Sequence, residues 1–437
     1  MKNSLISKTA LWLLLSILSA ASMAFYVAEI WSANQPSHFT DFYAPWWGAH
    51  ELLLHHRNPY SPAVAHEIQT VIYGAASSTS IDDPSNLEGG FAYPPYTALL
   101  LGPTVYLSFS EAEKTFLCLS ALATLLSFAL WLRVLRFPPS VQWLIIAIFA
   151  FGSFPTLQAL KLENLSLMAA ALITVTVFLL SANRLVLAGV LLALSTFKPQ
   201  FTIALIPWLA LWAVGDWRHR RRLVGGFLVT LGLLVLISEW IVPSWIRSFF
   251  HVLGAYRHYT YGHSLFDVWF TPKLGLLVSA CVLLAVLALS WKHRSEPADS
   301  MQFLLVTSLL LAVTLVVIPT LAPHAQLLLL PGLFYLLRRR AWSSSGALAA
   351  LLAAATWALM AWPWLATFGL VLLAVRVPIH TLLRFWDIPL YTSPLLPLAV
   401  AFALGSLLRS APGAGGREFH GLSPGFDLPS DPAKPEP

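Results

Sequence analysis

The 437-residue chain is 57% hydrophobic and only 11% charged, whereas about a quarter of the residues in an ordinary soluble domain are charged. A mean hydropathy of +0.71 and long Leu/Ala runs exclude a soluble enzyme and predict an all-α polytopic membrane protein. The net charge of +6 comes from basic residues clustered beside apolar stretches, which is typical of membrane topology rather than of nucleic-acid binding. No nucleic-acid partner is expected.

The N-terminal residues predict a first membrane span within residues 1–31. Two lysines precede an apolar run from Thr9 to Trp31, which is long enough for an uncleaved helix to cross the hydrocarbon core. A signal peptide cleaved after Ala24 is the alternative interpretation. With either interpretation, the segment that follows is exported.

Residues 32–112 are predicted to form a long exported loop with juxtamembrane helices. Within the segment from Pro45 to His56, apolar side chains recur at helical spacing, which favours an amphipathic helix at the membrane interface. A plain anchoring helix without chemistry is the other interpretation of this segment. Residues 94–108 open with two prolines and are broken by Gly102-Pro103, so they predict a re-entrant or juxtamembrane helix rather than a span.

Residues 113–410 are predicted to form the transmembrane core. Counting the first span, we expect about twelve or thirteen membrane spans in all. The expected spans of the core are 113–133, 141–158, 165–182, 185–198, 200–214, 223–242, 274–291, 301–318, 326–337, 346–361, 364–377 and 390–408. The Pro/Gly-rich tail, residues 411–437, has the composition of a disordered segment.

The distribution of Lys and Arg predicts the orientation of the chain. If residues 94–108 do not cross the membrane, the basic clusters near residues 133–136, 218–222 and 338–340 share one side with the N-terminus. By the positive-inside rule that side is the cytoplasm. The chain is therefore expected to be a multi-pass protein of the inner (plasma) membrane, with its working surface on the exported face.

Three ionisable residues on the exported face are candidates for chemistry. Asp41 follows the first span closely, so its carboxylate is expected near the lipid head groups, although it could equally cap a helix that starts near Ala44. Lys198 leaves an amine near membrane depth, where it needs an anionic partner or must snorkel to the surface. His324 can donate a hydrogen bond or share a proton, or it can simply lie in the interface.

The order of several short motifs resembles that of a known family. Asp41-Phe42-Tyr43, Asn58-Pro59-Tyr60 and Phe91-Ala92-Tyr93-Pro94-Pro95 follow one another in the exported loop, and Lys198-Pro199 and His324 come later. This order resembles glycosyltransferase family 87, whose members are integral-membrane GT-C enzymes, and it covers roughly residues 10–340. The chain is similar to the polyprenol-phosphate-mannose-dependent α-(1→2)-mannosyltransferases of that family.

The resemblance implies a GT-C fold and assigns roles to residues of this sequence. Asp41 would be the catalytic base, His324 a second active-site group and Lys198 a contact to the donor phosphate. Arg257 and Arg57 are further candidates for binding that phosphate, because a cation placed there stabilises the departing negative charge. The substrate groove is expected to include Tyr43, Asn58, Tyr60, Tyr93 and Asn164.

The expected activity is an inverting transfer of a hexose, with mannose as the first candidate, from a polyprenyl phosphate to a glycolipid or glycan. The expected partners are this donor, its acceptor and membrane lipids. No cofactor is expected, and no metal, because the adjacent His55 and His56 point apart on a helix and no set of Asp, Glu and His residues at ligand spacing accompanies them. A lipid or solute transporter or flippase, and a non-catalytic subunit with a GT-C scaffold, remain the alternative functions.

Overall fold

The computed structural model describes residues 41–74, 84–137, 154–259, 264–318, 323–338, 347–373 and 394–410, together with a few isolated positions. The predicted first span, most of the predicted span 141–158 and the C-terminal tail lie outside these residues. Every regular element in the described part of the chain is a helix.

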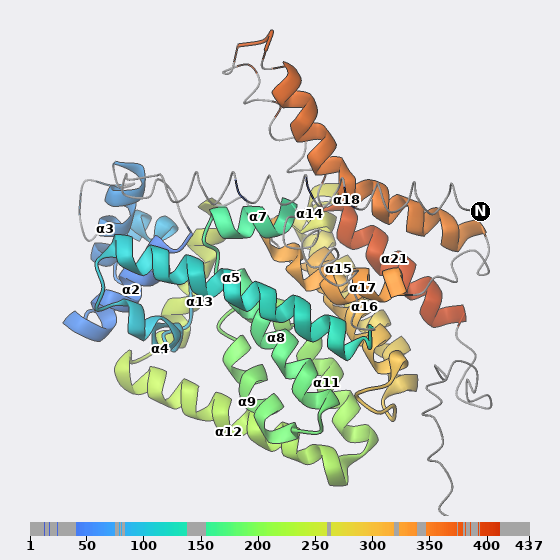
Figure 1. The fold of residues 1–437 in the computed structure, drawn as a ribbon. Coiled ribbons are helices and arrows are strands. Elements are labelled where there is room, and N and C mark those ends of the chain that lie inside the picture. The colour runs from blue at the N-terminus through green and yellow to red at the C-terminus, as the bar shows by residue number, and fades with distance from the viewer. Residues whose placement is uncertain are drawn as a thin grey trace, which may run out of the picture.

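The first group of helices belongs to the loop that the sequence predicts to be exported, and it lies at one end of the molecule (Figure 1). Its elements are α2 (Tyr43–His55), α3 (Pro62–Tyr73), η1 (Pro84–Gly89), α4 (Thr97–Leu101) and η2 (Gly102–Thr104). Helices α4 and η2 have five and three residues, so the stretch 94–108 does not form a spanning helix, as its prolines and Gly102 predicted.

The second group forms the helical body. Its elements are α5 (Phe109–Val134), α7 (Phe154–Lys161), α8 (Ser166–Ser181), α9 (Leu185–Ser195), α10 (Pro199–Thr202), α11 (Leu205–Gly215), α12 (Trp217–Ile241), α13 (Trp245–Tyr259), α14 (Leu265–Trp269), α15 (Pro272–Ser290), η3 (Trp291–His293), α16 (Met301–Val317), η4 (Pro323–Leu329), α17 (Leu330–Arg338), α18 (Ala347–Leu373) and α21 (Leu395–Ser410).

Several of these helices have the length and composition of membrane spans. Helices α5, α12 and α15 are long and apolar enough to cross a membrane, and shorter apolar helices follow the other predicted spans from residue 166 onward. Large apolar side chains on α12 are exposed, among them Leu236 and Trp240, as expected for a surface that faces lipid. The prediction of an all-α polytopic membrane protein is confirmed.

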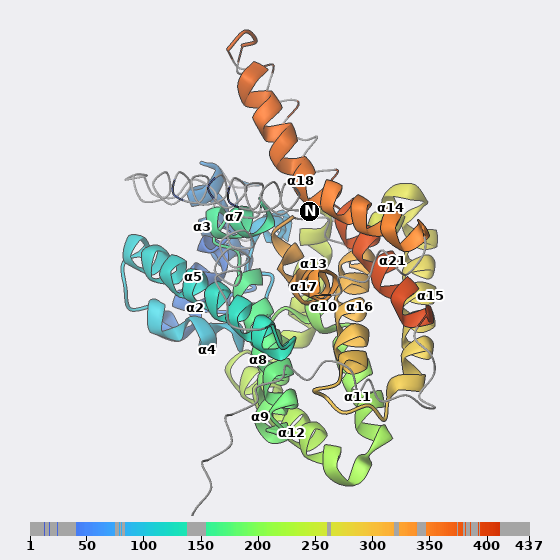
Figure 2. The same cartoon turned by 45° about the vertical axis from the view of Figure 1, so that its right-hand side comes forward.

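Helix α18 differs from the prediction. The sequence predicted two spans, 346–361 and 364–377, on either side of Pro363, whereas the structure has one helix of 27 residues with Pro363 inside it. A proline inside a helix removes one backbone hydrogen bond and bends the helix without having to end it. In two views one arm of the bent helix α18 extends away from the rest of the protein, while the other arm lies against α21 (Figure 2).

Helix α16 forms the centre of the body. All of its residues from Phe303 to Val317 are buried, and α15, α17, α21 and η4 pack around it. Two of its threonines form hydrogen bonds inside the protein, since the indole nitrogen of Trp208 donates to the hydroxyl of Thr307 at 3.2 Å and Thr314 donates to the carbonyl of Leu310. A helix that is apolar on all sides is stable at such a place because no side of it faces water.

One face of the body is held together by arginines. Arg220, at the start of α12, donates to the carbonyl oxygens of Trp212, Arg294 and Glu296, and its guanidinium lies 3.8 Å from the ring centre of Trp212. Arg136, just after α5, pairs with the carboxylate of Asp299 at 3.0 Å. The end of α5, the start of α12 and the connection between α15 and α16 therefore lie on the same face.

The first group of helices is fastened to the body by backbone and aromatic contacts. The amide of Asp41 donates to the carbonyl of Leu162 at 2.8 Å, and the hydroxyl of Tyr96 donates to the carbonyl of Thr196 at 3.0 Å. Phe42 is fully buried and stacks on Phe116 of α5 with ring centres 4.2 Å apart. The loop is thus part of the same packed structure as the helices it connects.

Helices α9 and α12 approach closely through glycines. A Cβ atom added at Gly189 would overlap the carbonyl oxygen of Leu223, whereas one added at Gly232 of α12 would meet no atom within 4 Å. Small residues permit this approach, and helices in membranes commonly associate through them.

We expect Gly189→Val to force the two helices apart and to lower the free energy of unfolding by about 1–3 kcal/mol. Thermal unfolding of the purified protein in detergent, followed by tryptophan fluorescence, measures the change. Gly232→Val is the matched control, because it makes the same substitution at a position of α12 where the added side chain meets no close neighbour. Equal losses in the two variants would contradict the role of the α9–α12 contact.

Candidate active site

Four of the predicted site residues lie at the ends of helices rather than within them. Asp41 precedes α2, Asn164 lies in the turn between α7 and α8, Lys198 immediately precedes α10, and His324 lies at the start of η4. Turns at helix ends leave polar side chains free to point at one another, because they are not committed to one face of a helix.

The turn between α7 and α8 orients Asn164. Glu163 adopts the left-handed conformation with φ at 50°, and the amide of Asn164 then donates to the carbonyl of Ala159 at 3.0 Å, which closes α7. A non-glycine residue in this conformation costs about 1–2 kcal/mol, so the turn is held by its surroundings. The side chain of Glu163 is almost completely buried.

Asn164 joins Asp41 to Lys198 through one continuous set of hydrogen bonds. Its amide nitrogen donates to Oδ2 of Asp41 at 2.5 Å, and its amide oxygen accepts from Nζ of Lys198 at 2.6 Å. Nζ of Lys198 also donates to Oγ of Ser166 at 2.8 Å, and Ser166 in turn donates to the amide oxygen of Asn164. A carboxylate and an ammonium group are thereby fixed on opposite ends of one amide.

Asp41 is not a helix cap. The N-cap residue of α2 is Phe42, and α2 has no side-chain cap hydrogen bond, so the capping alternative for Asp41 is wrong. Burial raises the pKa of the Asp41 carboxyl above its ordinary value, while the hydrogen bond from Asn164 and the charge of Lys198 act in the opposite direction. A carboxyl group with a raised pKa is a stronger base than an ordinary aspartate.

Lys198 is 5% exposed, and its ammonium group lies among aromatic rings as well as hydrogen-bond acceptors. Nζ lies 5.5 Å from the ring centre of Phe201 and 6.0 Å from that of Tyr93, within the range of cation–π attraction. The charge of Lys198 also acts on the ring of His324. Its hydrogen-bond partners are neutral, whereas the sequence predicted an anionic partner without identifying it. The carboxylate of Asp41 interacts with the ammonium group across Asn164.

Some of the residues predicted to form the substrate groove lie beside Lys198, and others lie further away. Tyr93 lies beside Lys198, and its carbonyl oxygen accepts from the hydroxyl of Tyr60 at 2.5 Å. Asn58 accepts from the backbone amide of Tyr60 at 3.0 Å, so it shapes the turn before α3. Tyr43 packs edge-on against Phe109 with ring centres 4.9 Å apart.

Arg57 lies far from Asp41. It follows α2, whose 13 residues put it about 20 Å away along the chain, and it forms ion pairs with Glu51 at 2.6 Å and with Glu67 at 2.7 Å. The structure therefore does not bring Arg57 together with Lys198. The other arginine candidate, Arg257, belongs to α13, but its side chain is outside the described part of the structure.

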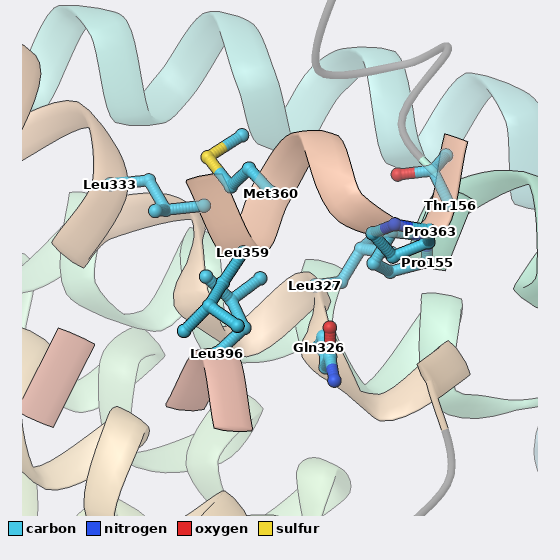
Figure 3. Close-up of a pocket in the computed structure, with 9 residues that line it drawn as sticks. All are labelled: Pro155, Thr156, Gln326, Leu327, Leu333, Leu359, Met360, Pro363 and Leu396. Carbon is cyan, nitrogen blue, oxygen red and sulfur yellow. The ribbon is translucent and has the colours of Figure 1, made fainter. Parts of the chain in front are cut away.

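A mostly apolar pocket lies beside the elements that carry Asn164 and His324. It is bounded by α7, η4, α17, α18 and α21 (Figure 3). Its lining residues are Pro155, Thr156, Gln326, Leu327, Leu333, Leu359, Met360, Pro363 and Leu396. Helix α7 ends just before Asn164, and η4 begins next to His324. The same two elements therefore line the pocket and position these two residues.

The sequence patterns did not indicate two further residues that hold Lys198 and its surroundings in place. Ser166, the first residue of α8, is fully buried and binds Lys198, although a serine at a helix start normally suggests only a local role. Tyr96, just before α4, fastens its segment to Thr196, two residues before Lys198. The only sequence signal for either was proximity to a motif.

The comparison with known families gives the class of protein. Residues 91–319, more than half of the chain, match the model of glycosyltransferase family 87. The chain therefore belongs to glycosyltransferase family 87 and is a membrane glycosyltransferase, as the order of its motifs predicted. The matched range contains Asn164 and Lys198. No curated protein and no solved structure gave a significant match.

The buried hydrogen bonds predict an energetic coupling between Asn164 and Lys198. We expect Asn164→Ala to lower the free energy of unfolding by about 1–3 kcal/mol, because it leaves the buried ammonium with one acceptor fewer. Adding Lys198→Met removes that stranded charge, so the double variant should lose less than the sum of the single losses, by about 0.5 kcal/mol or more. Unfolding curves in detergent supply all four stabilities.

The control cycle combines Asn164→Ala with Asp299→Asn, which alters an exposed ion pair at a different part of the fold. The two losses in this cycle should add. Additive losses for Asn164 and Lys198 as well would contradict the coupling.

Proposed function

We propose that this glycosyltransferase transfers a hexose, with mannose as the expected sugar, from a polyprenyl phosphate to a glycolipid or glycan acceptor. The reaction takes place on the exported face of the inner (plasma) membrane. The observation that supports the proposal most strongly is the chain of hydrogen bonds from Asp41 through Asn164 to Lys198, which holds a base and a cation in one fixed arrangement.

In the proposed reaction, the acceptor hydroxyl oxygen attacks the anomeric carbon of the donor sugar from the side opposite the phosphate. Asp41 takes the hydroxyl proton as the new bond forms, and the bond from the sugar to the phosphate oxygen breaks. The product therefore has the inverted configuration. A second carboxylate is not required, because the phosphate leaves as a stable anion without being protonated.

The departing polyprenyl phosphate gains negative charge in the transition state, and Lys198 is the proposed stabilising group. A buried, hydrogen-bonded cation is already in position when the charge develops, so it stabilises the transition state more than the ground state. His324 is the proposed second group, donating a hydrogen bond to the phosphate or the sugar.

The placement of charges supports the exported face. Helix α8 starts beside Asn164 and ends before Arg184, and α16 starts beside Asp299 and ends shortly before His324. Both helices therefore connect the face with the candidate site to the face fastened by arginines, and they do so in opposite directions. By the positive-inside rule the arginine-rich face is cytoplasmic, and nucleotide sugars are absent on the other side, so a lipid-linked donor fits there.

The apolar pocket supports an isoprenoid donor. Leu359, Met360 and Leu396 give it a lining suited to a hydrocarbon chain, while Gln326 on η4 follows His324 closely. A polyprenyl tail in this region would leave its phosphate near the polar group. Charged groups gather at helix ends and not at the middle of the spanning helices, which favours a transferase over a carrier.

The decisive experiment uses the purified protein in nanodiscs with radiolabelled polyprenyl-phosphate mannose and a membrane glycolipid extract. We expect label transfer by the wild type and a loss of about 10²–10⁴-fold for Asp41→Asn, because the amide cannot take the proton. Asp299→Asn is the matched control and should retain activity, since its carboxylate is exposed and remote from the site.

Full activity in a well-folded Asp41→Asn protein would overturn the assignment of the base. Absence of transfer by the wild type with a panel of lipid-linked sugars, combined with movement of a lipid head group across the bilayer, would replace the transferase proposal with the flippase alternative.

The pKa of Asp41 predicts the acidic side of the pH profile. Because burial raises this pKa and only the deprotonated carboxylate accepts a proton, kcat/KM should fall as the pH is lowered through a value above the ordinary 3.8. Asn164→Ala removes a hydrogen bond that lowers the pKa, so its acidic limb should move to higher pH. Initial rates across a pH series measure both limbs, and a shift to lower pH in the variant would contradict the proposal.

A further inference from the structure

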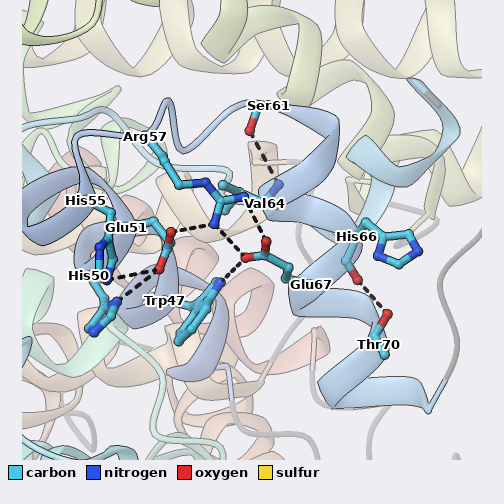
Figure 4. Close-up of polar contacts among 10 residues, drawn as sticks. All are labelled: Trp47, His50, Glu51, His55, Arg57, Ser61, Val64, His66, Glu67 and Thr70. Carbon is cyan, nitrogen blue, oxygen red and sulfur yellow. Dashed lines mark hydrogen bonds and ion pairs between the residues drawn. The ribbon is translucent and has the colours of Figure 1, made fainter. Parts of the chain in front are cut away.

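A second group of ionisable side chains lies on α2, away from the candidate active site. His50, Glu51 and His55 gather on the C-terminal half of this helix (Figure 4). His50 is nine residues after Asp41, or about 14 Å along the helix axis, and none of the three contacts Asn164 or Lys198. The proposed transfer reaction does not use them.

The three side chains present their ligand atoms to one common point. Oε1 of Glu51 lies 3.1 Å from Nδ1 of His50 and 4.0 Å from Nε2 of His55, and all three ligand atoms lie within 4.8 Å of one another. Around a tetrahedral zinc ion, with bonds of 2.0–2.2 Å, neighbouring ligands are about 3.4 Å apart. The half-exposed His55 can close the remaining distance by a small side-chain rotation.

Neighbouring residues hold two of the ligands in place. The ring of His50 stacks on Trp47 at 5.0 Å with an interplanar angle of 7°, and the indole nitrogen of Trp47 donates to Glu67 at 3.0 Å. Arg57 binds Oε2 of Glu51, which leaves Oε1 facing the two imidazoles. Such outer partners orient the ligands of metal sites and strengthen binding.

The charge of the group is complementary to a dication. Arg57 lies between the carboxylates of Glu51 and Glu67. The side chains of Arg57, Glu51 and Glu67 together carry one negative charge. Neutral imidazoles add none, and Glu51 is almost completely buried. Two imidazole nitrogens and one carboxylate oxygen are ligands that select zinc and related transition metals over magnesium or calcium.

We propose that His50, Glu51 and His55 bind one divalent transition-metal ion, with zinc as the reference ion and a fourth coordination position open to water. This proposal departs from the expectation of no metal, because the folded helix brings together His50, Glu51 and His55, a set that the sequence pattern did not indicate. Because all three ligands belong to the last two turns of α2, the ion secures the end of this helix, where His56 turns the chain with φ at 53°. Its expected effect is on stability rather than on the transfer reaction.

The test uses the full-length protein in detergent, with any affinity tag removed and bound metal stripped by a chelator. Titration with zinc chloride, followed by calorimetry, should give one equivalent per chain for the wild type and a higher melting temperature with the ion. His55→Ala should weaken binding by at least about tenfold. The matched control His66→Ala, which removes a histidine of the neighbouring helix α3, should bind as the wild type does.

Cobalt(II) provides an independent readout, because a tetrahedral site gives visible absorption bands that should be present in the wild type and lost in His55→Ala. His55 is half-exposed, so its removal is not expected to unfold the protein, and the melting temperature of the metal-free variant checks this. Absence of stoichiometric binding by the wild type would overturn the proposal. Equal binding by His55→Ala and His66→Ala would do the same, because the imidazoles would then serve only as hydrogen-bonding partners of Glu51.

Discussion

A buried ammonium group must find hydrogen-bond acceptors inside the protein, and Lys198 imposes this requirement on the surrounding helices. Its acceptors, Asn164 and Ser166, fix the start of α8 relative to the turn between α9 and α10. Asn164 has a second constraint, because its amide nitrogen binds Asp41, which precedes α2. One buried charge therefore determines how three distant segments meet, and the candidate active site is the place where they do.

The loop that carries α2, α3 and α4 is anchored at the same place. Backbone contacts at Asp41 and the hydroxyl of Tyr96 fasten the loop to the turns before Asn164 and Lys198, and Phe42 fills a place against α5. A loop packed in this way belongs to the same folded structure as the candidate site. The glycosyltransferase identity of the chain and the geometry of these turns are consistent, since glycosyl transfer needs a base and a cation at fixed positions.

Much of this organisation could be predicted from single residues, but the pairings could not. The order of motifs indicated glycosyltransferase family 87 and the candidates Asp41, Asn164 and Lys198. It did not indicate that Asn164 bridges the other two, because the bridge joins residues 123 and 34 positions apart in the sequence. Arg57 shows the reverse case, since its motif position suggested phosphate binding, whereas the fold gives it Glu51 and Glu67 as partners.

The sequence by itself determined the class of fold, because apolar runs of spanning length leave helices as the structure that satisfies every backbone group within lipid. It also determined the family and, through the basic clusters, the expected orientation. Only the tertiary structure decided that Pro363 lies inside one helix, that Ser166 is a partner of Lys198 and that His50, Glu51 and His55 converge. These features depend on distances between side chains, which helix packing sets and which local sequence patterns do not encode.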